Sequence, residues 1–328
     1  MEVKIVKFMN KVPGGVMVIT LLAGALLNTF VPGVLNIGGF TTGLLKNGTP
    51  CLMGLFLICC GASISFKQVG APLYKGTLLT VLKFAIGVAI GWGVQRFFGA
   101  EGIFGITPVV LIAVLTNSSG SIYATLADRF GDSTDVGAVS VLSVNDGPFL
   151  TMVALGATGM SDIPFLTLLA TILPIIIGIV WGNFDKEFKS LCDKALPLVI
   201  IFLSFVLGSG MSFVTVMQAG VSGVILGLIV LIFSGLLVNV LYCLILRRKT
   251  AVGAGAGTAA GNSVATPAAI AQADPSFAPY ADVATAQCSA ACVMTAILCP
   301  LMVAYLDKRI KKKEAEMVKI QTAQNESV

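Results

Sequence analysis

Long, uninterrupted apolar segments dominate this chain, and they predict helices that cross a membrane. A spanning α-helix needs about 20 predominantly apolar residues. The strands of a transmembrane barrel would instead alternate apolar and polar positions, and these segments do not alternate. The ninth segment is the least hydrophobic, and its Gly and Ala content is also compatible with a long loop. The predicted spans are 12–31, 49–66, 76–98, 103–127, 136–156, 163–181, 195–213, 221–246, 252–273 and 283–306.

Composition supports an all-α polytopic membrane protein with ten transmembrane helices. Of 328 residues, 56% are apolar and only 11% are charged, whereas soluble domains carry about 25% charged residues. The chain has no histidine, which excludes histidine-dependent catalysis and histidine metal sites. None of the 8 cysteines forms a CxxC pair. We expect them to be small buried apolar residues; a zinc site or a disulfide is the alternative.

The distribution of lysine and arginine predicts the orientation in the membrane. With the N-terminus inside, 18 of the 21 basic residues flank the spans on the inner side, and only Lys46 and Arg96 lie outside. Basic residues collect on the cytoplasmic side of membrane proteins. The sequence therefore predicts a cytoplasmic N-terminus (1–11), a charged cytoplasmic tail (307–328) and an even number of spans. The net charge of +5 reflects this orientation and does not indicate nucleic-acid binding.

Two short sequence matches indicate an internal repeat. Gly61-Ala-Ser-Ile-Ser-Phe66 matches Gly208-Ser-Gly-Met-Ser-Phe213 at an offset of 147 residues. An Asn-Ser step recurs at Asn117 and Asn262 at an offset of 145 residues. The offsets divide the chain into two five-helix halves, 12–156 and 163–306. Because five is odd, the second half enters the membrane from the opposite side. Such inverted repeats are a common plan of secondary transporters.

Small polar residues interrupt the fourth and ninth spans and predict a binding site there. Thr266-Pro267 has the residue types of a helix start, so we expect each span to consist of two half-helices. The N-terminus of a half-helix attracts an anion, and paired breaks in two halves point to a transport site. The alternative is a pair of polar kinks between packed helices. The candidate substrate-binding residues are Asn117, Ser118, Ser119, Asn262, Ser263 and Thr266.

Two charged residues within the predicted spans are candidates for proton coupling. Asp146 is the only acidic residue deep inside a span, and Lys83 lies at a similar depth. Buried ionisable residues in membranes pair with one another and mark ion pathways. We expect Asp146 and Lys83 to be paired in one state and apart in another. The alternative for Lys83 is that it snorkels or caps a carbonyl. Three acids on an inner loop with Arg129 are expected to be solvated: Asp128, Asp132 and Asp135.

Several motifs resemble those of the 2-keto-3-deoxygluconate permeases, over nearly the whole chain. They are Val12-Pro-Gly-Gly-Val-Met17, Gly61-Ala-Ser63, Asn117-Ser-Ser-Gly-Ser-Ile-Tyr-Ala124, Asn145-Asp-Gly-Pro148 with Thr151-Met152, and Ala260-Gly-Asn-Ser-Val-Ala-Thr-Pro267. The resemblance implies a symporter of the bacterial cytoplasmic (inner) membrane that imports 2-keto-3-deoxygluconate with protons. It also implies kinship with the bile acid/sodium symporters, with a panel of spans one, two, six and seven. The core would contain spans four and nine, crossed at the substrate site. The resemblance implies an acid where this chain has Asn145, one place before Asp146.

We therefore expect a transporter rather than an enzyme, with no catalytic residue, metal or cofactor. The coupling ion would be the proton, and the partners would be a small anionic sugar acid and the lipid bilayer. The oligomeric state is left open. The nearest alternative is a sodium-coupled symporter of another small organic anion. An intramembrane enzyme is disfavoured because the chain contains neither GxSxG nor HExxH. A passive channel fits the paired breaks less well than a carrier does.

Overall fold

The computed structural model describes residues 9, 15–64, 70–142, 148–160, 164–210 and 212–325. Within these ranges the chain is all-helical, as predicted, apart from an isolated bridge between Ile103 and Ile106. Four helices are long and apolar enough to cross a membrane: 71–98, 186–209, 217–246 and 275–317. Two bent helix pairs raise the number to as many as six in the described residues. The structure therefore supports a multi-span membrane protein, and the count of ten stays a prediction.

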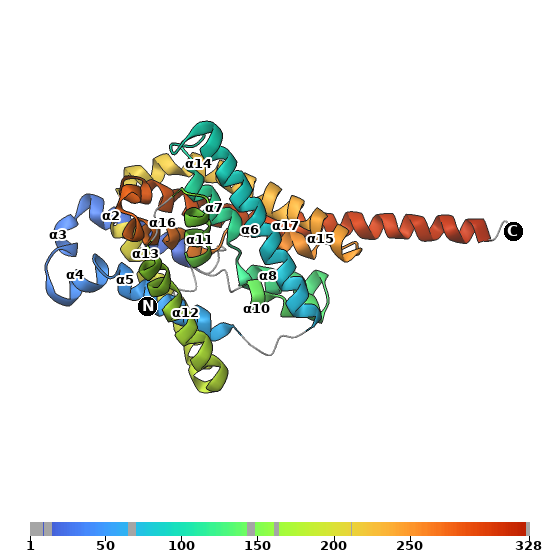
Figure 1. Cartoon of the computed structure of the whole chain (residues 1–328), viewed down its shortest axis with the longest axis horizontal. Coiled ribbons are helices and arrows are strands. Elements are labelled where there is room, and N and C mark those ends of the chain that lie inside the picture. Colours follow the sequence, from blue (N-terminus) through green and yellow to red (C-terminus); the bar gives the residue numbers. More distant parts are fainter. Residues whose placement is uncertain are drawn as a thin grey trace, which may run out of the picture.

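The described helices of the first half follow the predicted spans, and the fourth span is interrupted between α7 and α8. Two short helices, α3 and α4, form the connection between the first two spans. The elements are α2 (Gly15–Phe30), α3 (Pro32–Leu35), α4 (Gly39–Leu45), α5 (Thr49–Ser63), α6 (Ala71–Phe98), α7 (Pro108–Thr116), α8 (Gly120–Phe130), α9 (Ser133–Gly137), α10 (Val139–Leu142) and α11 (Phe149–Ala157) (Figure 1).

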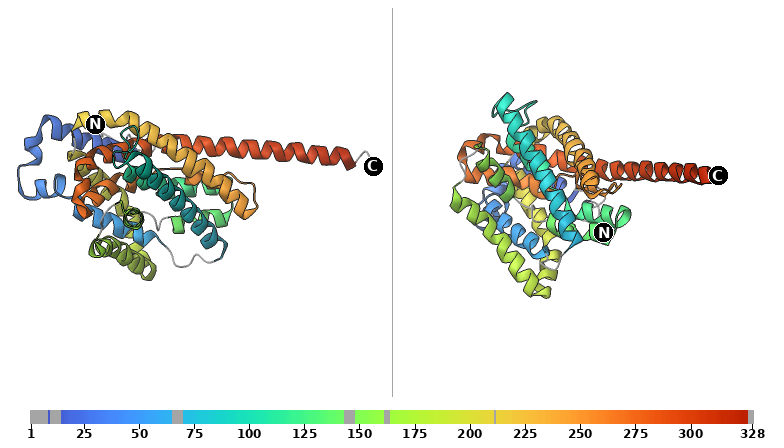
Figure 2. Two further views of the ribbon diagram at one scale, coloured as in Figure 1. Left: turned by 45° about the horizontal axis from the view of Figure 1, so that its top comes forward. Right: turned by 45° about the vertical axis from the view of Figure 1, so that its right-hand side comes forward.

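The second half contains longer helices and two short 3₁₀-helices, of which η3 lies where the ninth span was predicted to begin. A π-helical turn, η2, joins α14 to α15 without breaking the rod. The elements are α12 (Phe165–Phe184), α13 (Lys186–Ser209), α14 (Phe213–Val230), η2 (Leu231–Leu237), α15 (Val238–Leu246), η3 (Val252–Ala256), α16 (Gly261–Ala273), η4 (Pro275–Phe277) and α17 (Ala278–Asn325). The C-terminal part of α17 extends away from the other helices as a single rod (Figures 1 and 2).

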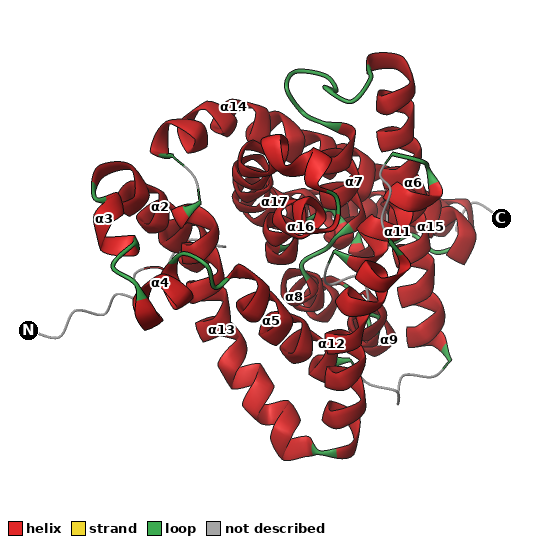
Figure 3. Ribbon diagram, turned by 60° about the vertical axis from the view of Figure 1, so that its left-hand side comes forward, coloured by secondary structure: helices red, strands yellow, loops and turns green. Residues whose placement is uncertain are grey.

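The helices divide into two groups that pack mainly within themselves (Figure 3). One group contains α2, α5, α12 and α13; the other contains α6–α11 and α14–α17. Glycines allow close contact inside the first group. A Cβ atom on Gly208 of α13 would lie 1.9 Å from the Leu21 carbonyl oxygen of α2. A Cβ atom on Gly61 of α5 would lie 2.3 Å from the Ile175 carbonyl oxygen of α12. Small residues of this kind let membrane helices approach closely.

Candidate binding site at two broken helices

The break predicted in the fourth span is confirmed. Helix α7 ends at Thr116, α8 begins at Gly120, and the two axes differ by 42°. Side chains at the break satisfy the last carbonyls of α7. The Thr116 hydroxyl donates to the Ile112 carbonyl at 2.8 Å, and the Asn117 amide donates to the Ala113 carbonyl at 2.8 Å. Because side chains cap these carbonyls, the helix can stop inside an apolar bundle without leaving them unpaired.

The ninth span is also broken, but four residues earlier than the sequence pattern predicted. The 3₁₀-helix η3 ends at Ala256, and α16 begins at Gly261. The prediction that Thr266 caps a helix start was wrong, because Pro267 lies inside α16. A proline in the second turn removes only one backbone hydrogen bond, so the helix continues through it. The break falls instead in a stretch rich in glycine, which is a poor helix former.

The two breaks are in direct contact. The Ser118 hydroxyl donates to the Ala256 carbonyl at 3.1 Å, and the Ser119 N–H donates to the Thr258 hydroxyl at 2.9 Å. The half-helices on either side also pack against each other in opposite order, α7 against α16 and α8 against η3. We call this contact between the two breaks the crossing. The structure thus brings Ser118 and Ser119 of one half of the chain together with the break of the other half.

Side chains from three further helices also bond the carbonyls that end α7 and η3. Ser234 of η2 donates to the Leu115 carbonyl at 2.8 Å, and the Cys299 thiol of α17 lies 3.3 Å from the Ala254 carbonyl oxygen. Lys83 of α6 is completely buried, and its ammonium donates to the Ala256 carbonyl at 2.5 Å. Of the alternatives for Lys83, the structure supports the one in which it caps a carbonyl.

The remaining candidate residues are placed unequally. Ser263 and Thr266 are fully buried in α16, and the Ser263 hydroxyl donates to the Ala260 carbonyl at 2.6 Å. Asn117 is also fully buried, and its side-chain oxygen accepts no hydrogen bond in the described part of the chain. The backbone of Asn262 lies in α16, but its side chain and the whole of Asp146 fall outside the described residues. The pairing of Asp146 with Lys83 therefore stays a prediction.

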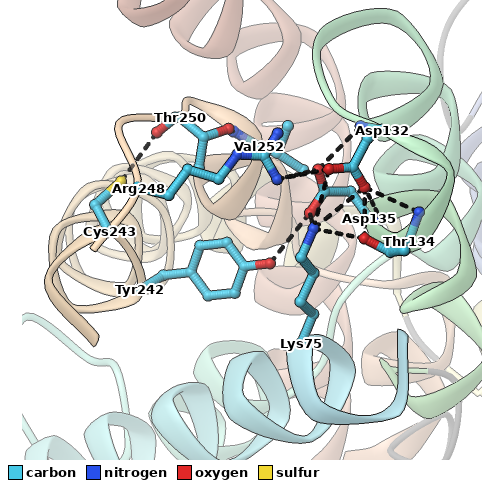
Figure 4. A network of polar contacts seen from close by, with 9 residues as sticks. All are labelled: Lys75, Asp132, Thr134, Asp135, Tyr242, Cys243, Arg248, Thr250 and Val252. Carbon is cyan, nitrogen blue, oxygen red and sulfur yellow. Dashed lines mark hydrogen bonds and ion pairs between the residues drawn. The ribbon is translucent and has the colours of Figure 1, made fainter. Parts of the chain in front are cut away.

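An ionic network beside the crossing corrects the expectation that Asp135 is solvated, whereas Asp132 is exposed as expected (Figure 4). Asp135 is completely buried. Its carboxylate accepts hydrogen bonds from Lys75 at 2.7 Å, Arg248 at 3.0 Å and Tyr242 at 3.3 Å. Arg248 also pairs with Asp132 at 2.8 Å. The network links α6 and the α8–α9 loop to the segment that leads into η3, so it ties together the two broken helices at one end.

The Asp132–Asp135 spacing was a signal that sequence reasoning missed. An N-cap residue followed three positions later by an acid is a capping box, and both reciprocal bonds are present here. Burial opposes ionisation of Asp132, but hydrogen bonds from Thr134, the Asp135 N–H and Lys75 outweigh it. They hold the pKa of Asp132 well below its usual value.

The cysteines are mostly buried, as expected. All eight are free thiols, and Cys51 is exposed. No group of three or more histidine, cysteine or acidic side chains in the described ranges is arranged to hold a metal ion.

Comparison with known proteins identifies the family. The family described as 2-keto-3-deoxygluconate permease matches residues 6–312. The chain is 45% identical over 303 residues to 2-keto-3-deoxygluconate permease 1 of Salmonella typhimurium, covering 92% of this chain and 95% of the relative. It is 37% identical over 316 residues to the 2-keto-3-deoxygluconate permease of Bacillus subtilis, covering 95% and 96%. With matches over nearly its whole length, the chain belongs to the 2-keto-3-deoxygluconate permease family, whose name denotes a transporter and not an enzyme.

Proposed function

We propose that this protein is a secondary active transporter that imports 2-keto-3-deoxygluconate together with protons by alternating access. The observation that carries the proposal is the contact between two broken helices through Ser118, Ser119, Ala256 and Thr258. Broken backbone at membrane depth is tolerated where it is buried in protein or lines a cavity, and in carriers it forms the site. The substrate follows from the names of the relatives, which are 2-keto-3-deoxygluconate permeases.

The substrate carboxylate would bind at the N-termini of α8 and α16, where unpaired N–H groups carry partial positive charge. Ser119 is half-buried at the start of α8, whereas Asn117, Ser118, Ser263 and Thr266 are buried. Asn117 and Asn262 would bond the hydroxyl or keto oxygens. The side-chain oxygen of Asn117, which lacks a partner in the described residues, is suited to accept a hydroxyl proton. Reaching these groups would require the two helix groups to move apart.

The proposed architecture is ten spans in two inverted repeats, with a panel of α2, α5, α12 and α13 and a core of the other helices. Exchanging the two halves converts the α2–α13 contact into the α12–α5 contact, and both are observed. The same exchange converts α7–α16 into η3–α8, and both of these are observed as well. These reciprocal contacts support the repeat. The proposed location is the inner membrane of a bacterium. The distribution of basic residues supports an orientation in which both termini face the cytoplasm.

In the proposed coupling, Asp146 loads and releases the proton and Lys83 is its partner in one state. Sodium is the other candidate ion, because half-helix C-termini such as those of α7 and η3 can coordinate it.

Uptake of labelled 2-keto-3-deoxygluconate into proteoliposomes tests the proposal. We expect an inward proton gradient to drive saturable accumulation and a sodium gradient alone to drive none. Asn117→Ala should lose most of the uptake, whereas Asn36→Ala, whose side chain bonds the Pro32 carbonyl at an exposed site, should retain it. Uptake that follows sodium and ignores protons would overturn the coupling, and uptake that never saturates would overturn the carrier.

A further inference from the structure

The buried face of α6 leads directly to the crossing of the broken helices. A Cβ atom on Gly91 would lie 2.3 Å from Ile112 of α7, and one on Gly87 would lie 2.9 Å from Thr116. Helix α6 therefore packs tightly along α7 as far as Thr116, the last residue of α7. Lys83 lies one helical turn further along the same face, beyond the end of α7. Its side chain consequently reaches the break itself.

Among the described residues, the Lys83 ammonium meets the end of the helix η3. The ammonium donates to the carbonyl of Ala256, which is the last residue of η3. The same carbonyl accepts a hydrogen bond from the Ser118 hydroxyl. Carbonyls at a helix C-terminus carry partial negative charge. In the described part of the chain, no carboxylate forms an ion pair with Lys83. The Lys83 amino group is thus held beside a carbonyl and a hydroxyl oxygen at complete burial.

This environment is the one in which broken-helix carriers hold an alkali cation. In such carriers, unwound carbonyls and half-helix C-termini coordinate the coupling Na⁺. We propose that the Lys83 ammonium is a tethered cation that occupies the sodium position at the crossing, so that this protein binds no alkali cation there. The inference deepens the proposed function and rests on the crossing being the transport site. It assigns the choice of coupling ion to Lys83.

Thermal unfolding of the purified protein without substrate tests the proposal. The Tm is measured in NaCl and in choline chloride at equal ionic strength. We expect the wild type to unfold at the same temperature in both salts. Lys83→Ala should unfold at a lower temperature, because it leaves oxygens around an empty space. At about 150 mM NaCl its Tm should rise by about 3 °C relative to choline chloride, since Na⁺ binds only the folded state.

Two variants serve as matched controls. Lys83→Met fills the space with a neutral chain of similar length, so it should be destabilised but should not respond to sodium. Lys189→Ala removes a lysine that also bonds the carbonyl at a helix end, that of Ser63 at 3.1 Å, but at a partly exposed site. It should show no sodium response, because water can replace its ammonium.

Two results would overturn the proposal: a sodium-specific rise in the Tm of the wild type, or no such rise in Lys83→Ala. If Lys83→Ala does not fold, equilibrium binding of labelled sodium to the wild type decides. Saturable binding would overturn the proposal, and its absence would support it. No substrate enters these measurements. A failure of 2-keto-3-deoxygluconate uptake would therefore count against the proposed function alone.

Discussion

At the residue scale, the main feature of this protein is that buried polar side chains are used to satisfy backbone carbonyls and each other. Asn117, Ser118 and Lys83 each bond a carbonyl at one of the two breaks. The Asp135 carboxylate accepts hydrogen bonds from two cationic side chains and a tyrosine hydroxyl. Burying a polar group without a hydrogen-bond partner is costly. Replacing one side chain of these contacts should therefore lower the stability of the folded protein by more than the few atoms removed would suggest.

Asp135→Asn should destabilise the protein by about 3 kcal/mol, because removing one partner of a buried ion pair leaves the other charge uncompensated. The uncompensated charge is chiefly that of Lys75, whose ammonium lies 2.7 Å from the Asp135 carboxylate. Thermal or denaturant unfolding in detergent measures the loss. The control is Asp128→Asn, an exposed acid near the end of α8, which should change the stability by less than about 0.5 kcal/mol. Equal effects of the two variants would contradict the role of the network.

Asp132 should make the stability depend on pH in acid. Its pKa is lowered in the folded protein, so its stabilising effect is complete above its ordinary unfolded pKa, about 3.9. That effect is lost as the pH falls toward the folded value. The Tm difference between the wild type and Asp132→Asn should be constant from about pH 6 to pH 8 and should shrink below about pH 4. A difference that grows on acidification would contradict this assignment.

At the element scale, glycines determine which helices can pack closely. Gly24 and Gly208 join α2 to α13, while Gly61 and Gly178 join α5 to α12. Glycine is also responsible for the second break, which occurs in a glycine-rich stretch before α16 and not at Pro267. The error in the prediction came from giving proline more weight than glycine. Proline near a helix start is tolerated, whereas repeated glycines weaken a helix.

Gly208→Ala should destabilise the protein by about 2 kcal/mol, because its new methyl group would collide with the backbone of α2. The Cβ atom would lie 1.9 Å from the Leu21 carbonyl oxygen. Gly54→Ala in α5 is the control, since nothing lies within 4 Å of its Cβ position. That change should be neutral or stabilising, because alanine is the better helix former. Unfolding temperatures of the two variants give the comparison, and a stabilised Gly208→Ala would contradict the observed contact.

At the scale of the whole molecule, the described helices form two groups, and the two broken helices are in contact inside the second group. The charged end of α17 extends beyond both (Figure 2). In the predicted orientation, most basic residues, the ionic network and this extension face the cytoplasm. Lys46, one of the two basic residues predicted to lie outside, bonds the Asn28 side chain at 2.7 Å and the Ser209 carbonyl at the end of α13. Its position is thus explained by a helix end, where a cation is favoured.

The proposed orientation predicts which cysteines a membrane-impermeant maleimide labels in intact cells. In a background with all eight native cysteines replaced by alanine, Phe40→Cys in α4 should be labelled, since Phe40 is 99% exposed on the outer side. Glu187→Cys at the exposed start of α13 should be labelled only after the membrane is permeabilised. The opposite pattern would reverse the topology inferred from the basic residues.

The sequence by itself determined the helical membrane class, the break at Asn117–Ser119, the mostly buried cysteines and the family. These properties follow from local hydrophobicity, from polar residues within apolar runs and from motifs, all of which are readable along one segment. Only the tertiary structure decided the position of the second break, the contact between the two breaks and the partners of Lys83 and Asp135. Ala256 lies 173 residues from Lys83, and Arg248 lies 113 residues from Asp135. Such pairs form only when separate helices pack, because the partner of a buried charged group is the polar group that packing places next to it.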